Sequence, residues 1–333
     1  MKALLSKAPG GPQTLVVEEV ADPQPGPGQV RIAVRACGVN FPDALIIEDR
    51  YQLRPPRPFS PGAEVAGVVD ALGEGGRAPA LGTRVIGWAG YGGMAEKLVL
   101  EAERCLPMPE AMPFEEAAAF IMTYGTSLHA LKDRGRLKAG ETLLVLGAAG
   151  GVGLAAVELG KAMGAKVIAA VSSEEKAALA KARGADAAIV YPKGPFDDAG
   201  RKALAELFKG AAGDHGANVI YDPVGGDYTE AALRAIAWEG RFLVVGFPAG
   251  IAKLPMNLPL LKGCDVAGVF WGAFVAREPA RNRAEIAELL DLYGRGLVKP
   301  EVSEVFPLAR AGDAIAALSE RRAKGKLVVR MDG

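Results

Sequence analysis

The most informative stretch of the sequence is Leu143-Leu144-Val145-Leu146-Gly147-Ala148-Ala149-Gly150-Gly151-Val152-Gly153, in which an apolar run leads into a glycine-rich turn. Good helix-forming residues follow at 154–163. This order of strand, turn and helix is typical of the loop that binds a dinucleotide pyrophosphate. Gly150 would let the backbone approach the phosphates, and Gly153 would let the helix pack on the strand. We therefore expect Ala149, Gly150, Gly151, Val152 and Gly153 to bind the cofactor, with Ala148 where the motif usually has its first glycine.

Short apolar segments alternate with helical patterns from this loop toward the C-terminus. Such alternation predicts parallel strands whose sheet is covered by helices on both faces. The expected strands are residues 143–146, 166–171, 187–191, 217–221, 241–246 and 265–270, and the expected helices between them are residues 174–182, 202–208 and 229–237.

The first third of the chain has a different character. Apolar residues alternate in short segments separated by turns, as at residues 15–20, 30–36, 64–71 and 84–88, which is typical of half-buried antiparallel strands. No long amphipathic pattern precedes residues 114–134, which have helical spacing. The sequence thus predicts an α/β protein with a β-rich domain followed by a doubly wound parallel-sheet domain, and a last strand at 327–330 that returns to the first domain.

The composition limits the classes of partner. The chain has 333 residues, 50% of them hydrophobic, with 39 basic and 39 acidic side chains. A balanced charge predicts no general attraction to nucleic acid or anionic membranes. We find no secretory leader and no apolar run long enough to span a membrane, and the three cysteines are odd in number and far apart. These features favour the cytoplasm.

The end of the second predicted strand indicates which dinucleotide binds. Enzymes that use NAD usually place an acidic residue here to bind the ribose 2′-hydroxyl. This chain has Ser172 and Ser173 instead, with Lys176 one helical turn later. Hydroxyls and an ammonium suit the 2′-phosphate of NADPH, which a carboxylate would repel. Glu174 and Glu175 are the counter-evidence, and we interpret them as water-facing residues of the first helical turn.

Two further residues are candidates for the cofactor site. Tyr191, at the end of the third strand, could offer a phenolic donor to the 2′-phosphate. Lys326 is the other candidate, although the short basic stretch that contains it, residues 321–322 and 324–326, is more typical of a solvated surface.

At this point the sequence resembles the medium-chain dehydrogenase/reductase superfamily, and within it the zinc-free quinone oxidoreductase (zeta-crystallin-like) branch. The resemblance covers essentially the whole chain and is carried by residues 38–43, 61–67, 147–153, 221–226 and 244–247. It implies a GroES-like catalytic domain at 1–121 and 273–333, and a Rossmann NADPH-binding domain at 122–272.

The resemblance also bears on the metal. Zinc enzymes of this superfamily bind their catalytic metal with a cysteine and a histidine where this sequence has Asn40 and Ala63. Alanine cannot coordinate and an asparagine amide is a poor zinc ligand. The family's four closely spaced structural-zinc cysteines are also absent, and Cys37 does not align with a ligand, so it is expected to be a packed thiol. We therefore expect no metal.

The resemblance assigns the remaining site residues. Tyr51, Asn40 and Asp43 correspond to the substrate pocket, with Tyr51 the candidate proton donor to an electrophilic small-molecule acceptor. Tyr51 could instead cap a loop in its proline-rich stretch, and Asn40 and Asp43 could be turn formers. The residues expected to flank the nicotinamide are Thr126, Gly246, Phe247, Phe270 and Trp271, of which the last two could be core residues.

The activity that the resemblance implies is hydride transfer from NADPH to a quinone or conjugated carbonyl. Two alternatives stay open: an enoyl-thioester or alkenal reductase, and a non-catalytic NADPH-binding protein of the crystallin type. We also expect a homodimer that pairs through residues 265–270, because an unpaired apolar edge strand needs a cover and the family points to the same edge.

Overall fold

The computed structural model describes residues 1–75, 79–320 and 322–331. The chain divides into two compact units, residues 1–122 with 300–333, and residues 123–299. The sequence-based assignment of residues 273–299 to the β-rich domain differs from this division. Helices α9 (Trp271–Arg277) and α10 (Pro279–Gly294) belong with the second unit, because Phe274 stacks on His129 and Lys132 pairs with Glu288 there.

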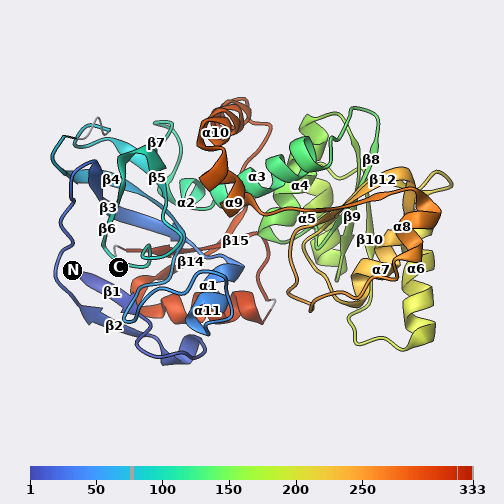
Figure 1. Ribbon diagram of the computed structural model, residues 1–333, viewed down its shortest axis with the longest axis horizontal. Helices are drawn as coiled ribbons and strands as arrows, with labels where there is room; N and C mark the ends of the chain where they lie inside the picture. Colours follow the sequence, from blue (N-terminus) through green and yellow to red (C-terminus); the bar gives the residue numbers. More distant parts are fainter. Residues whose placement is uncertain (76–78, 321, 332–333) are drawn as a thin grey trace. The chain divides into compact units, whose positions relative to one another are not determined.

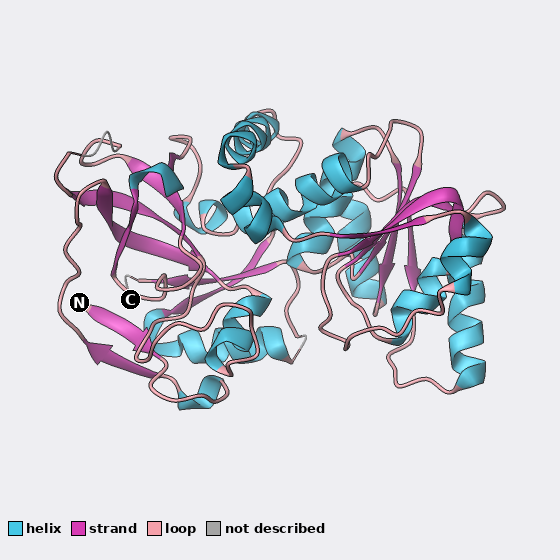
Figure 2. Cartoon of the chain, in the orientation of Figure 1, coloured by secondary structure: helices cyan, strands magenta, loops and turns pink. Residues whose placement is uncertain are grey.

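The second unit contains a six-stranded sheet in which every pair of neighbours is parallel. Its spatial order is β10-β9-β8-β11-β12-β13, which is the Rossmann order when the strands are counted from β8. Figures 1 and 2 show the sheet together with the helices of this unit. The strands are β8 (Thr142–Leu146), β9 (Lys166–Val171), β10 (Ala187–Val190), β11 (Ala217–Asp222), β12 (Ile236–Val244) and β13 (Asp265–Gly268).

Helices cover this sheet as predicted. The connecting helices are α4 (Gly151–Ala162), α5 (Glu174–Ala182), α6 (Asp198–Ala212), α7 (Asp227–Leu233) and α8 (Asn257–Lys262). Helices α4 and α5 contact β8, β9 and β10, whereas α6 packs against α7. An apolar core under α6 and α7 includes Leu144, Ile220 and Phe242 from the strands and Phe208 from α6. Because side chains alternate along a strand, the neighbours of these strand residues point to the opposite face.

Two expected elements differ in detail. The pattern at 114–134 does not form one helix, but α2 (Phe114–Ala117), α3 (Ile121–Leu128) and a π-helical turn, η3 (His129–Arg134). The expected helix at 229–237 ends at Leu233, and β12 begins at Ile236, earlier than expected. The apolar residues Ile236 and Ala237 fit either structure, and pairing with β11 makes them a strand.

The first unit is β-rich, as predicted. Its main sheet has the order β14-β15-β3-β4-β5-β7, and β6 also pairs with β3. Most of its pairs are antiparallel, whereas β14 and β15 run parallel. Its strands are β3 (Gln29–Gly38), β4 (Glu64–Leu72), β5 (Arg84–Trp88), β6 (Lys97–Glu101), β7 (Cys105–Pro107), β14 (Val302–Pro307) and β15 (Lys326–Arg330).

Short helices complete the first unit. They are α1 (Phe41–Ile47), α2, α11 (Ala311–Ser319) and the 3-10 turns η1 (Pro12–Thr14), η2 (Ala102–Arg104) and η4 (Leu308–Arg310). The C-terminal strand β15 pairs antiparallel with β3, so the end of the chain returns to the first unit as predicted.

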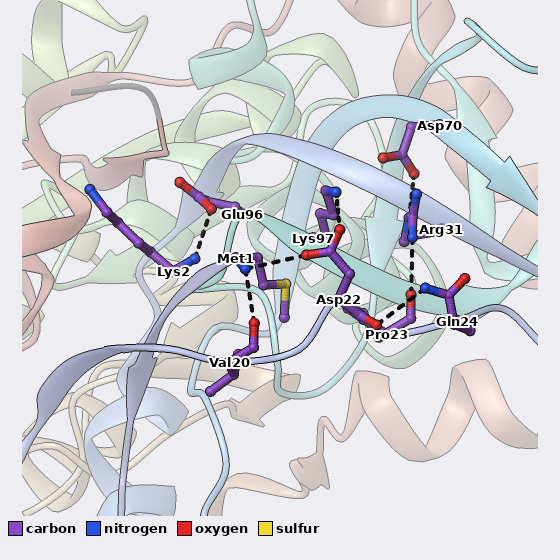
Figure 3. A network of polar contacts seen from close by, with 10 residues as sticks. All are labelled: Met1, Lys2, Val20, Asp22, Pro23, Gln24, Arg31, Asp70, Glu96 and Lys97. Carbon is purple, nitrogen blue, oxygen red and sulfur yellow. Dashed lines mark hydrogen bonds and ion pairs between the residues drawn. The ribbon is translucent and has the colours of Figure 1, made fainter.

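A hairpin of β1 (Lys2–Leu5) and β2 (Val16–Glu19) lies beside the main sheet, and polar contacts fix its start (Figure 3). The Met1 ammonium donates to the carbonyl of Val20 at 2.9 Å and lies 3.3 Å from Asp22, which also pairs with Lys97. The Arg31 guanidinium donates to Asp70 at 2.8 Å on the neighbouring strand. These contacts make the first residues of the chain part of the folded unit.

Among the described residues, no helix is both long and apolar enough to cross a membrane. All three cysteines are free thiols. Cys37 is fully buried in the core of the first unit, which confirms its interpretation as a packed residue, and burial raises the pKa of its thiol.

Candidate active site

The glycine-rich loop has the geometry that the motif predicts. It follows β8 directly, and Gly150 is the N-cap of α4. A methyl group on Gly153 would lie 2.2 Å from the carbonyl oxygen of Gly147, so only glycine lets α4 approach the strand this closely. A methyl group on Gly150 would meet no atom nearer than 3.4 Å. The loop therefore leaves room in front of the helix N-terminus, where backbone N–H groups attract phosphate.

The three polar residues at the end of β9 lie together. The Ser173 hydroxyl caps α5 by accepting from the backbone N–H of Lys176 at 3.3 Å, and the Lys176 ammonium lies 3.5 Å from the Ser172 hydroxyl oxygen. Glu174 and Glu175 are exposed in the first turn of α5, as expected. The group thus offers a cation and a hydroxyl at the strand end that reads the ribose.

Tyr191 has a structural environment. Its side chain is only 6% exposed, and the ring packs against Phe208 and Tyr228 with centroid distances of 6.1 and 5.0 Å. Packing in this aromatic cluster accounts for the position of the ring without a ligand, and a role of the hydroxyl in binding phosphate stays a prediction.

The residues expected near the nicotinamide have different surroundings. Thr126 and Gly246 are partly exposed, and Phe247 and Phe270 are exposed. Trp271 is buried, and its indole lies so close to Gly125 of α3 that a methyl group there would be 2.8 Å from the ring. Trp271 is therefore a packing residue of the second unit, whereas the others present surface that a ligand could contact.

A second loop, at the end of β11, depends on a carboxylate that the sequence did not single out. Asp222 is buried and accepts from the backbone N–H groups of Val224 at 2.8 Å and Gly225 at 2.9 Å, and from the Thr229 hydroxyl at 2.5 Å. Burial raises the pKa of this carboxyl group. The signal was present in the motif at 221–226, where an aspartate ends an otherwise apolar strand. Its bonds fix the loop beside the glycine-rich turn, because β11 and β8 are neighbours.

In the first unit, Asn40 and Asp43 begin helix α1. Asn40 is the N-cap, and its backbone N–H donates to Asp43 Oδ2 at 2.7 Å. Asp43 Oδ1 accepts from the backbone N–H of Gly62 at 2.9 Å. Both side chains are buried. These contacts favour the alternative of turn formers, and a direct catalytic role for either residue stays a prediction.

A buried ion pair surrounds the Asn40 side chain. The ammonium of Lys326 donates to Asn40 Oδ1 at 2.6 Å and to Glu64 Oε1 at 2.8 Å, and the Asn40 amide nitrogen donates to Glu64 Oε1 and to the carbonyl of Gly38. Glu64 Oε2 accepts from the backbone N–H of Met122. Lys326 is only 5% exposed, so the idea that it lies on a solvated surface is wrong. Its observed partners are protein groups, and cofactor binding stays a prediction.

Glu64 is the principal residue of this cluster that the sequence analysis missed. A charged side chain at the start of the apolar segment 64–69 was the available signal. Gly38 is required by the same packing, because a methyl group there would lie 2.0 Å from the carbonyl oxygen of Ala118 and 2.7 Å from Glu64 Oε1.

Tyr51 is partly buried against the core of the first unit. Burial, together with the negative charge of Asp43, raises the pKa of the Tyr51 hydroxyl. Burial also raises the pKa of Asp43 to about 6, although two backbone N–H groups and Lys326 favour its ionised form. Tyr51 therefore keeps its proton at neutral pH, which is the state that a proton donor needs.

The donor set does not fit a catalytic zinc ion. Ala63 is buried and offers only a methyl group, and both amide hydrogens of Asn40 are already donated within the protein. The ammonium of Lys326 lies 2.6 Å from the remaining amide oxygen and would repel a second cation. These residues are therefore unsuited to holding a zinc ion at this place.

Among the described residues, one other group has the ligand types for a metal: His129, Asp133 and Glu285 in the second unit. His129 Nδ1 lies 2.6 Å from Asp133, and Arg281 pairs with both carboxyl groups. Burial and the neighbouring Asp133 raise the pKa of Glu285 to about 7. Arg281, which pairs with both carboxyl groups, already supplies a positive charge where a metal ion would have to bind.

Comparison with known proteins agrees with this geometry. The alcohol dehydrogenase GroES-like domain family matches residues 26–110, and the zinc-binding dehydrogenase family matches residues 151–293. The rat protein named quinone oxidoreductase-like protein 2 is 38% identical over 319 residues, which cover 95% of this chain and 89% of the relative.

Solved structures show the same fold along the whole chain. The quinone oxidoreductase of Thermus thermophilus, determined alone and with NADPH, is 36% identical with a TM-score of 0.84, and 99% of this chain matches 100% of that chain. The Escherichia coli quinone oxidoreductase in complex with NADPH is 27% identical with a TM-score of 0.90 at the same coverage. The chain therefore belongs to the quinone oxidoreductase branch of the medium-chain dehydrogenase/reductase superfamily, with a GroES-like unit and a Rossmann unit.

Proposed function

We propose that this protein transfers hydride from NADPH to a quinone or a similarly conjugated carbonyl, without zinc. The observation that carries the proposal is the glycine-rich turn at the N-terminus of α4 together with Ser172 and Lys176 at the end of the next strand. A phosphate-binding loop and a cation for the 2′-phosphate are the two features that NADPH requires of a Rossmann unit. The NADPH complexes of the Thermus and E. coli relatives support this assignment.

Zinc independence is supported by the donor set in the first unit. Asn40 and Ala63 stand at the ligand positions, and Lys326 already supplies a positive charge beside Asn40. We expect less than about 0.1 zinc per purified chain, because neither residue is a competent ligand. A metal assay with and without chelator tests this, and stoichiometric zinc whose removal abolishes activity would contradict it.

NADPH supplies the hydride when bound, so the protein must hold the acceptor and provide a proton. We assign the proton to the Tyr51 hydroxyl, whose raised pKa keeps it protonated at neutral pH. At the start of α1, the buried side chains of Asn40, Glu64 and Lys326 bond to one another. Tyr51 is only partly buried, so it is the more accessible proton donor among the candidate residues.

The experiment is an NADPH oxidation assay with quinones, alkenals and enoyl thioesters, on the wild type and on Tyr51→Phe. General acid catalysis contributes about 10²–10⁴-fold, so kcat should fall by at least the lower figure with enones or enoyl thioesters, where carbon must be protonated. The loss should be small with quinones, whose reduced oxygen takes a proton from water. An unchanged kcat for every acceptor would show that Tyr51 does not donate the proton and only lines the pocket.

The same acceptor series separates the alternatives. Turnover of enoyl thioesters or alkenals above quinones would favour the reductase of carbon–carbon double bonds. NADPH binding without turnover of any acceptor would favour the non-catalytic, crystallin-like role.

We place the protein in the cytoplasm, where its three thiols would stay reduced.

We also propose that two chains pair through β13. This strand pairs with β12 on one side and, within the described part of the chain, with no strand on the other. Val266 on it and Trp238 on β12 are 41% and 69% exposed. An apolar edge of this kind promotes aggregation unless a second copy covers it. Light scattering at micromolar concentration should give the mass of a dimer, and a monomer, or a dimer that survives Val266→Lys, counts against the pairing.

A further inference from the structure

A chain of two buried hydroxyls reaches the phosphate loop from behind. Ser127 on α3 donates from its hydroxyl to the carbonyl oxygen of Val152 at 3.0 Å, and its oxygen lies 2.9 Å from the hydroxyl of Tyr221 on β11. A serine hydroxyl has one hydrogen, and a carbonyl can only accept. The Tyr221 hydroxyl is therefore the donor to Ser127, and the order is Tyr221 to Ser127 to Val152.

Both hydroxyls lie in the protein interior. Ser127 and Tyr221 are each 0% exposed, and burial raises the pKa of the Tyr221 hydroxyl, which therefore stays a donor at every physiological pH. A buried hydroxyl without a partner is unfavourable, because the hydrogen bonds that it loses to water are not replaced. The two side chains therefore hold each other in one arrangement, and that arrangement includes the backbone of the loop.

The position of the carbonyl group that accepts from Ser127 makes this bond relevant to phosphate binding. Val152 is in the first turn of α4 and belongs to the glycine-rich loop. The N–H groups of a first helical turn have no partner within the helix and are the groups that would meet the pyrophosphate. A bond to the carbonyl of Val152 fixes the orientation of that turn from the opposite side. Tyr221 and Asp222 are consecutive on β11, so the same strand holds the neighbouring loop through Asp222.

We propose that Tyr221 and Ser127 are positioning residues for the phosphate loop, which set the affinity for the dinucleotide without touching it. The inference rests on the proposed function, because the loop has to bind NADPH for its orientation to be measurable.

The chain offers a matched control on the same helix. Tyr124 is also a buried residue of α3, and its hydroxyl also reaches α4, where it donates to Glu158 Oε2 at 2.6 Å. Glu158 lies about two helical turns beyond the loop. Tyr124→Phe thus removes a hydroxyl of the same kind between the same two helices, away from the phosphate site.

The experiment measures the NADPH dissociation constant by calorimetry and the thermal midpoint of Tyr221→Phe, Ser127→Ala, the double variant and Tyr124→Phe. The first two should raise the Kd by about 2- to 12-fold, the range for one lost hydrogen bond, with kcat at saturating NADPH within about 2-fold of wild type. The Kd of the double variant should be no higher than that of the single variant with the higher Kd, because both substitutions break the same series of hydrogen bonds. Tyr124→Phe should lower the thermal midpoint and leave the Kd unchanged.

A purely structural role would lower the thermal midpoint in all variants without changing the Kd, and that result overturns the inference. An equal rise of the Kd in Tyr124→Phe would overturn it too. Failure of the wild type to bind NADPH overturns the proposed function and the inference together, whereas wild-type binding with unchanged variants overturns only the inference.

Discussion

The two polar centres of this protein use their hydrogen-bonding groups in opposite ways. In the first unit, Asn40, Glu64 and Lys326 bond to one another and to the backbone, and all three are buried. In the second unit, the glycine-rich turn leaves space beside Gly150, and Ser172 and Lys176 are partly exposed.

This difference distinguishes a centre that stabilises the fold from a surface that can bind a ligand. A polar group that is buried and fully paired stabilises one conformation, whereas a group that keeps an accessible donor can exchange water for a ligand. Family motifs contribute to both centres, with Asn40 and Glu64 in the first and residues 147–153 in the second. We propose that the first centre stabilises the fold and that the second binds the cofactor, and the following experiments test that proposal.

The largest effect is expected from breaking the buried ion pair. Lys326→Met leaves the Glu64 carboxylate buried without its cation, which should lower the free energy of unfolding by about 3–5 kcal/mol. Urea denaturation measures this, with Lys7→Met as the control, because the exposed pair of Lys7 with Glu18 contributes at most about 1 kcal/mol.

The double variant with Glu64→Gln should be less destabilised than the sum of the single variants, because the unpaired charge is gone. If Lys326→Met keeps its stability but binds NADPH more weakly, Lys326 binds the cofactor and does not stabilise the fold.

The second effect concerns pH. The pKa of Asp43 is raised to about 6 in the folded state from an ordinary value of 3.8, so the folded protein holds this proton more tightly than the unfolded chain. Its contribution to stability is therefore fully present below about pH 4 and is lost as the pH rises to about 6, by about 3 kcal/mol in total. The charged groups that act on it are Glu64 and Lys326.

Denaturation curves between pH 4 and 8 should therefore show a smaller decline for Asp43→Asn than for the wild type. Glu285, with a pKa raised to about 7, titrates in both proteins and cancels in the comparison. Parallel curves for the two proteins would show that Asp43 is ionised throughout.

The smallest of the three effects tests the binding surface. A charge-assisted bond contributes about 1.5–3 kcal/mol, so Lys176→Ala should weaken NADPH binding by about 10- to 150-fold and barely change NADH binding. Lys181→Ala, on the exposed side of the same helix, is the control. Calorimetric titration with both cofactors measures this, and equal losses for NADPH and NADH would mean that Lys176 does not read the 2′-phosphate.

Many strands and helices could be predicted from the sequence, because the patterns that indicate them span residues close together along the chain. The apolar segment before Gly147, the turn and the helix after it predicted β8 and α4, and the next strands alternated with helices as expected. Predictions failed where two structures suit the same residues, as at Ile236, which strand pairing with Ala217 placed in β12. The segment 114–134 was read as one helix because periodicity does not report the break between α2 and α3.

The sequence by itself therefore determined the glycine-rich turn with the strand and helix around it, and the serines and lysine at the end of β9, because each depends on residues that are near one another along the chain. The limit of the second unit at Lys299 depended on the tertiary contacts of α9 and α10. The tertiary structure alone decided the partners of the buried polar groups. Lys326 and Glu64 are 262 residues apart, and Ser127 and Tyr221 are 94 apart. No local pattern encodes such pairs, because the free energy that joins them arises only when folding removes both groups from water and leaves each the other as its partner.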